Sequence, residues 1–264
     1  MNARDHFQAG QLAEAIAAVT ADVKQAPLDS NHRGFLCELL SFAGEYDRAD
    51  KQLKTLGEME PASMLGVNLF RQLIRAEEAR QQFYSDGRLP EFLQEPGPVL
   101  KLHLEASIRL REGQKQEAVE LLRQAEEQRA KVSGTCDGQP FNDLRDLDDL
   151  TASFFEVLTS TGKYYWVAFD GVESLEFRPP ARARDLLWRP ARLIVRGGPD
   201  GEVFLPTLYA GSQAETDAAL RRGRATDWRG GTGEPTRGVG LRTFLMGDDS
   251  RPILEIHELT IGEK

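Results

Sequence analysis

The side chains that most often do chemistry in proteins are scattered through this 264-residue sequence rather than gathered. Zinc needs histidine, cysteine or acidic ligands at short, regular spacings. The four histidines fall on separate predicted elements without such neighbours: His6, His32, His103 and His257. The two cysteines, Cys37 and Cys136, are also far apart and follow no metal spacing. We therefore predict no metal site.

Candidate nucleophiles and phosphate loops are equally isolated. Ser153, Thr159 and Ser160 have no His or Asp at a recognisable offset, and no Gly-x-Ser-x-Gly elbow occurs. The glycine-rich stretch 197–201 lies between two predicted strands rather than before a helix, which favours a hairpin turn over a phosphate cradle. We predict no catalytic residue, no cofactor site and no enzymatic activity.

Two charged clusters require an explanation. The first is a run of four aspartates placed before an apolar segment: Asp143, Asp146, Asp148 and Asp149. We interpret it as capping and macrodipole stabilisation of a helix predicted over 146–160, rather than as a carboxylate site. The second is a set of six arginines between 178 and 196, interleaved with Phe177 and Trp188. Such a set suits an interface or a phosphate ligand, but we favour ion pairs with acidic residues elsewhere in the chain.

Those acidic residues lie in the front of the chain. The first 162 residues contain 18 Lys+Arg and 27 Asp+Glu, whereas the remainder contains 15 of each, so the first part carries the net charge of −9. This charge argues against nucleic acid there. It fits a basic or amphipathic peptide partner, or solubility alone. With only two cysteines, no recognisable signal peptide and no apolar run of membrane length, we expect a cytoplasmic protein without membrane contact.

An internal sequence repeat with a period of 34 residues predicts the helices that must position any functional residues. Gly10, Ala15 and Pro27 return as Gly44, Ala49 and Pro61, and the pattern reappears from Gly113 with Ala118. A fixed period of this length is typical of helix-turn-helix repeats of the tetratricopeptide type, which bind segments of other proteins. The glycine closes the turn, the alanine allows close helix packing, and the proline ends the second helix.

The repeat pattern predicts helices over 5–7, 12–25, 31–42, 46–57 and 63–84, and a further hairpin around Gly113. The first helix of each hairpin normally faces the concave side of the stack. We therefore predict that the partner-binding residues are Gly34, Glu38, Ser41, Phe42, His103, Ser107, Leu110 and Arg111.

Beyond residue 162 the apolar period changes from helical to alternating. Strands are predicted over 164–169, 191–196, 202–209, 241–246 and 253–259, with a helix over 212–221 and a flexible loop over 230–240. The predicted fold class is α+β, with N-terminal tetratricopeptide-like helical repeats followed by a small, mostly antiparallel C-terminal α+β domain. We place the helical-repeat domain at 1–132, a turn-rich linker at 133–145 and the C-terminal domain at 146–264.

Three sequence segments in the C-terminal part of the chain resemble a known family. They are Leu187-Trp188-Arg189-Pro190-Ala191, residues 201–209 with Leu205-Pro206-Thr207-Leu208-Tyr209, and residues 240–245. Together these segments are similar to the ImpE/TagJ family of accessory proteins of bacterial type VI secretion systems. The resemblance covers essentially the full length. It implies a non-catalytic cytoplasmic adaptor that binds a helix near the N-terminus of the small subunit of the contractile sheath. A link to the sheath-recycling AAA+ ATPase is also implied.

Two other function classes remain open at this point. One is a general helical-repeat scaffold of a different complex. The other is a protein that binds a phosphate ligand through the arginine-rich C-terminal domain.

Overall fold

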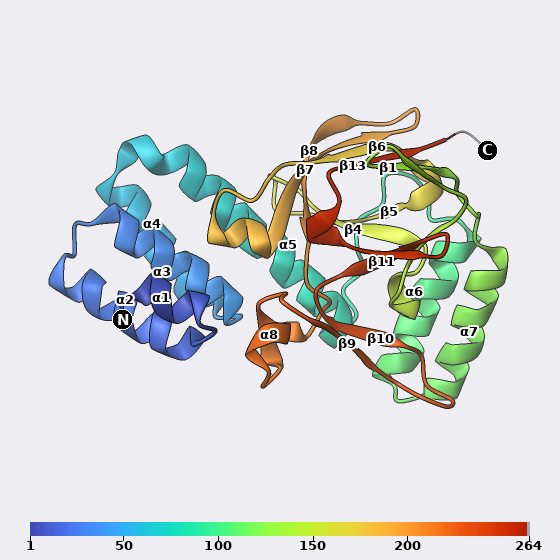
Figure 1. Cartoon of the computed structure of the whole chain (residues 1–264), viewed down its shortest axis with the longest axis horizontal. Coiled ribbons are helices and arrows are strands. Elements are labelled where there is room, and N and C mark those ends of the chain that lie inside the picture. Colours follow the sequence, from blue (N-terminus) through green and yellow to red (C-terminus); the bar gives the residue numbers. More distant parts are fainter. Residues whose placement is uncertain (263–264) are drawn as a thin grey trace.

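Four short helices form the N-terminal end of the molecule in the computed structural model, which describes residues 1–262. They are α1 (Ala3–Gln8), α2 (Leu12–Gln25), α3 (Ser30–Phe42) and α4 (Tyr46–Met59), and they pack as two antiparallel hairpins (Figure 1). Gly10 and Gly44 close the hairpins at φ of 88° and 72°, a conformation that favours glycine. Ala15 and Ala49 are fully buried where the helices meet. The repeat prediction is confirmed here.

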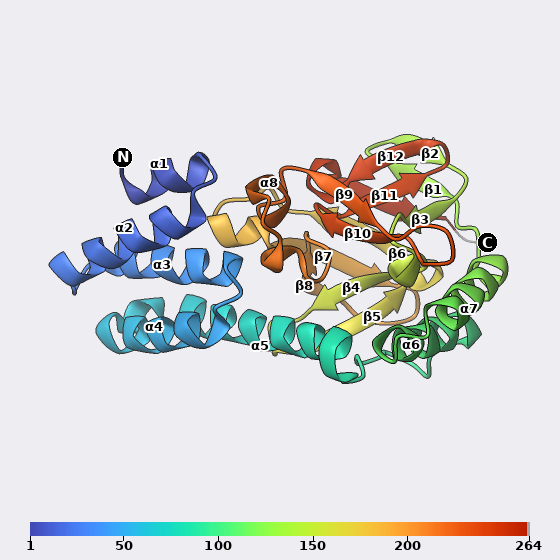
Figure 2. The same ribbon diagram turned by 90° about the horizontal axis from the view of Figure 1, so that it is seen from below.

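A long helix, α5 (Met64–Asp86), carries the chain away from these hairpins across the molecule (Figure 2). A third hairpin follows at the opposite end, formed by α6 (Pro98–Arg111) and α7 (Lys115–Gln128). It repeats the same turn, with Gly113 at φ 76° and Ala118 fully buried. The third hairpin therefore does not stack on the first two, and the hairpins do not share one concave surface.

An eight-stranded sheet lies between the two helical ends, in the order β2-β1-β13-β6-β7-β8-β4-β5, and all of its neighbouring strands are antiparallel. Its strands are β1 (Gly134–Cys136), β2 (Gln139–Phe141), β4 (Phe154–Leu158), β5 (Tyr164–Ala168), β6 (Val172–Phe177), β7 (Trp188–Val195), β8 (Asp200–Pro206) and β13 (Glu258–Ile261). The predicted α+β class with an antiparallel C-terminal part is confirmed.

Smaller elements cover one side of this sheet. A three-stranded sheet has the order β12-β11-β3, and a hairpin pairs β9 with β10. The strands are β3 (Leu144–Asp146), β9 (Thr226–Arg229), β10 (Arg237–Gly240), β11 (Thr243–Met246) and β12 (Asp249–Pro252). The short helices are α8 (Ala218–Arg221) and the 3-10 turns η1 (Pro61–Ser63), η2 (Asp149–Thr151), η3 (Phe169–Gly171), η4 (Ala183–Leu186), η5 (Ser212–Ala214) and η6 (Ile253–Glu255). No helix in the described part of the chain is sufficiently long and apolar to cross a membrane.

Several predictions of secondary structure are wrong. The strand predicted over 253–259 is η6 followed by the start of β13. The helix over 146–160 is instead η2 followed by β4, whose five residues are all buried because the strand is covered on both faces. A strand buried on both faces loses the alternating pattern that identifies strands. The linker 133–145 contains β1, β2 and the start of β3. The loop 230–240 contains β10, and the helix over 212–221 is reduced to η5 and α8. Where the chain divides into domains stays a prediction.

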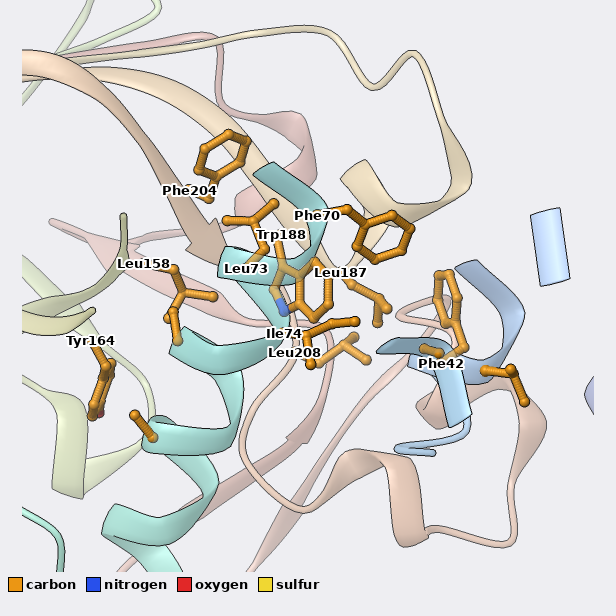
Figure 3. Close-up of a cluster of buried hydrophobic side chains, with 14 of the residues drawn as sticks. Phe42, Phe70, Leu73, Ile74, Leu158, Tyr164, Leu187, Trp188, Phe204 and Leu208 are labelled. Atoms are coloured by element: carbon orange, nitrogen blue, oxygen red, sulfur yellow. The ribbon is translucent and has the colours of Figure 1, made fainter. Parts of the chain in front are cut away.

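The helices and the sheet share a hydrophobic core. Figure 3 shows Phe70, Leu73 and Ile74 of α5 beside Trp188 and Leu208 of the β part. Each of these side chains is buried, and Phe70 meets the Trp188 ring edge-on at 6.0 Å between centroids. A second core cluster fills the space between the eight-stranded and three-stranded sheets. Helix α5 therefore fastens the N-terminal hairpins to the sheet.

Candidate partner-binding groove

The predicted partner-binding residues of α3 have two different environments. Gly34 and Glu38 line a groove with a volume of about 740 Å³. Ser41 and Phe42 are buried: the Ser41 hydroxyl donates to the Cys37 carbonyl at 2.9 Å, and the Phe42 ring packs edge-on against Phe7. Only the first two can therefore touch a partner without rearrangement.

The predicted residues of α6 lie elsewhere. His103 and Ser107 are buried, and the His103 ring packs edge-on against Phe154. Burial lowers the pKa of His103 to about 3, so the ring is neutral. Leu110 and Arg111 line a separate hollow of about 440 Å³ beside the C-terminal end of α5. The eight predicted residues thus divide between two places rather than forming one surface.

The groove at α3 is built from both halves of the chain. One side comes from α3, α4, η1 and the first turns of α5, and the other from residues 181–184, which belong to the β6–β7 connection and include the start of η4. In Figures 1 and 2 this turn lies against the N-terminal helices. The apolar lining residues are Phe35, Leu53, Leu56, Leu65, Val67 and Phe70. A sequence pattern could not reveal the η4 side, because only the folded chain brings it to α3.

An exposed leucine stands at the groove edge. Leu65 lines the groove and is 85% exposed, and its neighbour Met64 is 41% exposed. Small residues leave open space beside the backbone here, since a Cβ atom added at Gly34 or Gly66 would have no other atom within 4 Å. Leu65 is the exposed member of the apolar lining, whereas the other apolar lining residues are buried beneath the groove surface.

The groove also contains charges of both signs: Arg4, Arg182 and Arg184 on the positive side, Glu38 and Glu60 on the negative. The Glu38 carboxylate makes no hydrogen bond or ion pair with any described residue. Burial raises its pKa, and the nearby Arg184 and Arg182 offset this effect only in part. A half-buried carboxylate that accepts no hydrogen bond is costly, and a donor from outside the chain would stabilise it.

The η4 turn is held rigidly. The Asp185 carboxylate accepts hydrogen bonds from the backbone N–H groups of Ala181 and Arg182, both at 2.9 Å. The Arg184 guanidinium lies 4.9 Å from the centroid of the Phe70 ring and 3.8 Å from the Asp185 carboxylate. The conformation of the arginine side of the groove is therefore already fixed in the protein without a partner.

Most arginines of the 178–196 stretch pair inside the β part. Arg178 pairs with Glu176 and Glu202, and Arg192 pairs with Asp200. Arg189 and Arg196 donate to the backbone carbonyls of Ile253 and Ile261. The hypothesis that these arginines pair with the acidic helical half is wrong, because carboxylates and backbone carbonyls of the β part accept their hydrogen bonds.

A buried ionic network fixes α5 to the sheet instead. The Arg80 guanidinium on α5 donates to Glu156 of β4 at 2.9 and 3.0 Å and to Glu77 at 3.0 Å. Glu77 accepts the indole N–H of Trp188 at 3.1 Å. Arg242 also donates to Glu156 and pairs with Asp146 at 2.6 Å. No local sequence pattern indicates this network, because its hydrogen-bonded partners are up to 111 residues apart in the chain.

The aspartates of residues 143–149 mainly form ion pairs with arginines rather than capping a long helix. Asp146 pairs with Arg242, Asp148 with Arg237, Asp143 with Arg129 and Asp149 with Arg145. Asp148 also caps η2 by accepting from the Leu150 N–H at 2.8 Å. Capping is thus confirmed for one aspartate, on a much shorter helix than expected. Among the described residues, no group of three His, Cys, Asp or Glu side chains could hold a metal ion.

Comparison with known proteins shows that the chain is similar to an accessory protein of a bacterial secretion system. Residues 138–260 match the family model described as ImpE protein. The chain is 30% identical over 259 residues to the type VI secretion system accessory component TagJ of Pseudomonas aeruginosa, covering 98% of this chain and 90% of that protein. The X-ray crystal structure of a protein from Vibrio parahaemolyticus superposes with a TM-score of 0.92 at 26% identity, covering 99% of this chain and 98% of that one.

Proposed function

Since this chain belongs to the ImpE/TagJ family and so has an accessory role in type VI secretion, we propose that it is a non-catalytic cytoplasmic adaptor. In this proposal it binds the N-terminal helix of the small subunit of the contractile sheath. The helix occupies the groove between α3, α5 and η4.

The observation that carries this proposal is the groove between α3, α5 and η4, with the 85% exposed Leu65 at its edge. An amphipathic helix binds by laying one apolar face into such a groove, with anchors at positions i, i+3, i+4 and i+7. The partner helix loses conformational freedom on docking, so we expect micromolar affinity.

Calorimetric titration of a synthetic peptide of that sheath helix into the purified protein tests the proposal. Leu65→Glu places a charge at the groove edge and should weaken binding at least tenfold, or about 1.4 kcal/mol. Leu28→Glu is the matched control, because Leu28 is also 85% exposed but does not line the groove. The absence of any heat of binding at high peptide concentration would contradict the adaptor proposal.

A third variant separates the two hollows. Leu110→Glu alters the hollow beside the C-terminal end of α5, whereas the groove adjoins the N-terminal end of the same helix. If Leu110→Glu abolishes binding and Leu65→Glu does not, the helix occupies the hollow at α6. In our proposal the hollow at α6 stays open when the sheath helix is bound, which leaves a surface for the AAA+ ATPase implied by the resemblance.

A further inference from the structure

We propose that the groove selects its helix by charge as well as by apolar shape. The occupant carries a lysine or arginine that meets Glu38 and, one turn away, an aspartate or glutamate that meets Arg182 and Arg4. This inference rests on the proposed function only in taking a helix as the occupant. It concerns which helices the groove accepts and in which direction they lie.

Glu38 supplies the first half of the argument. It lines the groove, is partly buried and has no hydrogen-bond or ion-pair partner in the described chain. A bound helix would remove much of its remaining water. An unpaired carboxylate that loses its water without gaining a donor costs free energy, so a wholly apolar helix face is a poor fit here. A lysine or arginine on the helix supplies both the donor and the opposite charge.

The arginines supply the second half. Arg4 and Arg182 are exposed at the groove and make no ion pair with a described residue, whereas Arg184 already pairs with Asp185. Arg4 is held by its contact with the Phe35 ring, 4.9 Å from the centroid. Three arginines around one cationic side chain would repel it. An acidic side chain on the occupant removes this repulsion and uses the two unpaired guanidiniums.

Helix geometry allows one occupant to satisfy both halves. Side chains three or four positions apart lie next to each other on the same helix face. A basic and an acidic residue at that spacing can therefore reach Glu38 and the arginine side together. Reversing the helix would place like charges together, so the charge pair also fixes the direction of binding.

The test uses the full-length protein and a displayed library of amphipathic helical peptides randomised at the groove-facing positions. Selection on the wild type should enrich Lys or Arg at one position and Asp or Glu three or four residues away. Glu38→Lys should reverse the preferred charge at the first position, and Arg182→Glu at the second. Glu58→Lys is the matched control, because Glu58 is an exposed helical glutamate that does not line the groove.

Affinities of individual peptides then quantify the effect. Glu38→Lys should weaken the wild-type-selected peptide about tenfold or more, and exchanging the peptide's basic residue for Glu should restore binding. Proton release provides a second readout. Because burial raises the pKa of Glu38 in the free protein, pairing with a cation should lower it and release protons, and Glu38→Gln should abolish this release. Calorimetry in two buffers of different ionisation enthalpy measures it.

The outcomes separate this inference from the proposed function. If the sheath peptide fails to bind but the library yields the charge pair, the proposed function is wrong and the inference stands. If the sheath peptide binds equally to wild type, Glu38→Lys and Glu58→Lys, the inference is overturned and the function stands. A selection without charge preference at these positions also overturns the inference.

Discussion

At the scale of single residues, Glu156 decides how the helical part is attached to the sheet. Its carboxylate has no exposed side-chain surface, and it accepts from Arg80, Arg242, Tyr84 and Tyr164. Burial would raise its pKa, but Arg80 and Arg242 outweigh that effect and lower the pKa to about 2. The residue is therefore ionised and paired throughout the physiological range.

Glu156→Gln should destabilise the fold by about 3 kcal/mol, since it leaves two buried guanidiniums with less compensating charge. The midpoint of urea unfolding measures this loss. Glu120→Gln is the matched control: Glu120 pairs with Arg123 on the exposed face of α7, and its loss should leave the midpoint unchanged. Equal midpoints for the two variants would show that the buried network adds no stability.

The same variant has a defined pH dependence. The folded pKa of Glu156 lies below its ordinary value of 4.5, so its contribution to stability is complete above pH 4.5 and is lost as the pH falls toward 2. The stability difference between wild type and Glu156→Gln should accordingly be constant above about pH 5 and shrink at lower pH.

The sequence could anticipate the environment of a residue only where neighbours along the chain decide it, and contact of the groove residues with a partner stays a prediction. Gly34 and Glu38 line the groove as expected for the first helix of a repeat hairpin. Ser41 and Phe42, one helical turn later, are buried, and the Phe42 ring packs against Phe7 of α1. The partners of Glu156 lie 72 to 86 residues away in the chain, except for Tyr164, and no local pattern links them.

At the scale of elements, local signals explain which predictions were correct. The helices α2, α3 and α4 begin within a residue of their predicted starts, because the glycine turn before α2 and α4 and the Asp29 cap before α3 act within a few residues. Strand β4 was mistaken for a helix because its spacing of large apolar residues also fits a helical face. Pairing with β5 and β8 decides its conformation, and that pairing is not encoded locally.

Ala49→Leu tests the helix packing of the repeat. Ala49 has no exposed surface in α4, which packs on α3, so the added methyl groups have no space there. Overpacking of this kind should cost about 1–3 kcal/mol and lower the melting temperature by several degrees. Ala17→Leu on the exposed face of α2 is the control and should leave melting unchanged. An unaltered melting curve for Ala49→Leu would refute the packing of the repeat.

At the scale of the whole molecule, the helical and β parts depend on each other. Helix α5 contributes Phe70, Leu73 and Ile74 to the core shared with the sheet, and the β6–β7 connection returns η4 to the groove at α3. The binding surface proposed above is therefore a property of the assembled chain. Neither the repeats nor the sheet would form it alone.

The shared core predicts that both parts unfold together. All three tryptophans, Trp166, Trp188 and Trp228, lie in the β part, so fluorescence follows the sheet while circular dichroism at the helical band follows mainly α1–α7. The two urea transitions should coincide, as expected for one cooperative unit.

Leu73→Ala extends this test to the contact itself. Leu73 is buried in the shared core, and truncating it should cost about 2–5 kcal/mol. Because the leucine contributes to the packing of both parts, the fluorescence and dichroism transitions should move to lower urea by the same amount. If only the dichroism transition moves, or if the two transitions are already separate in the wild type, the sheet folds independently of α5. The groove would then be an interface between two bodies that can part, and peptide binding would have to stabilise their contact as well as fill it.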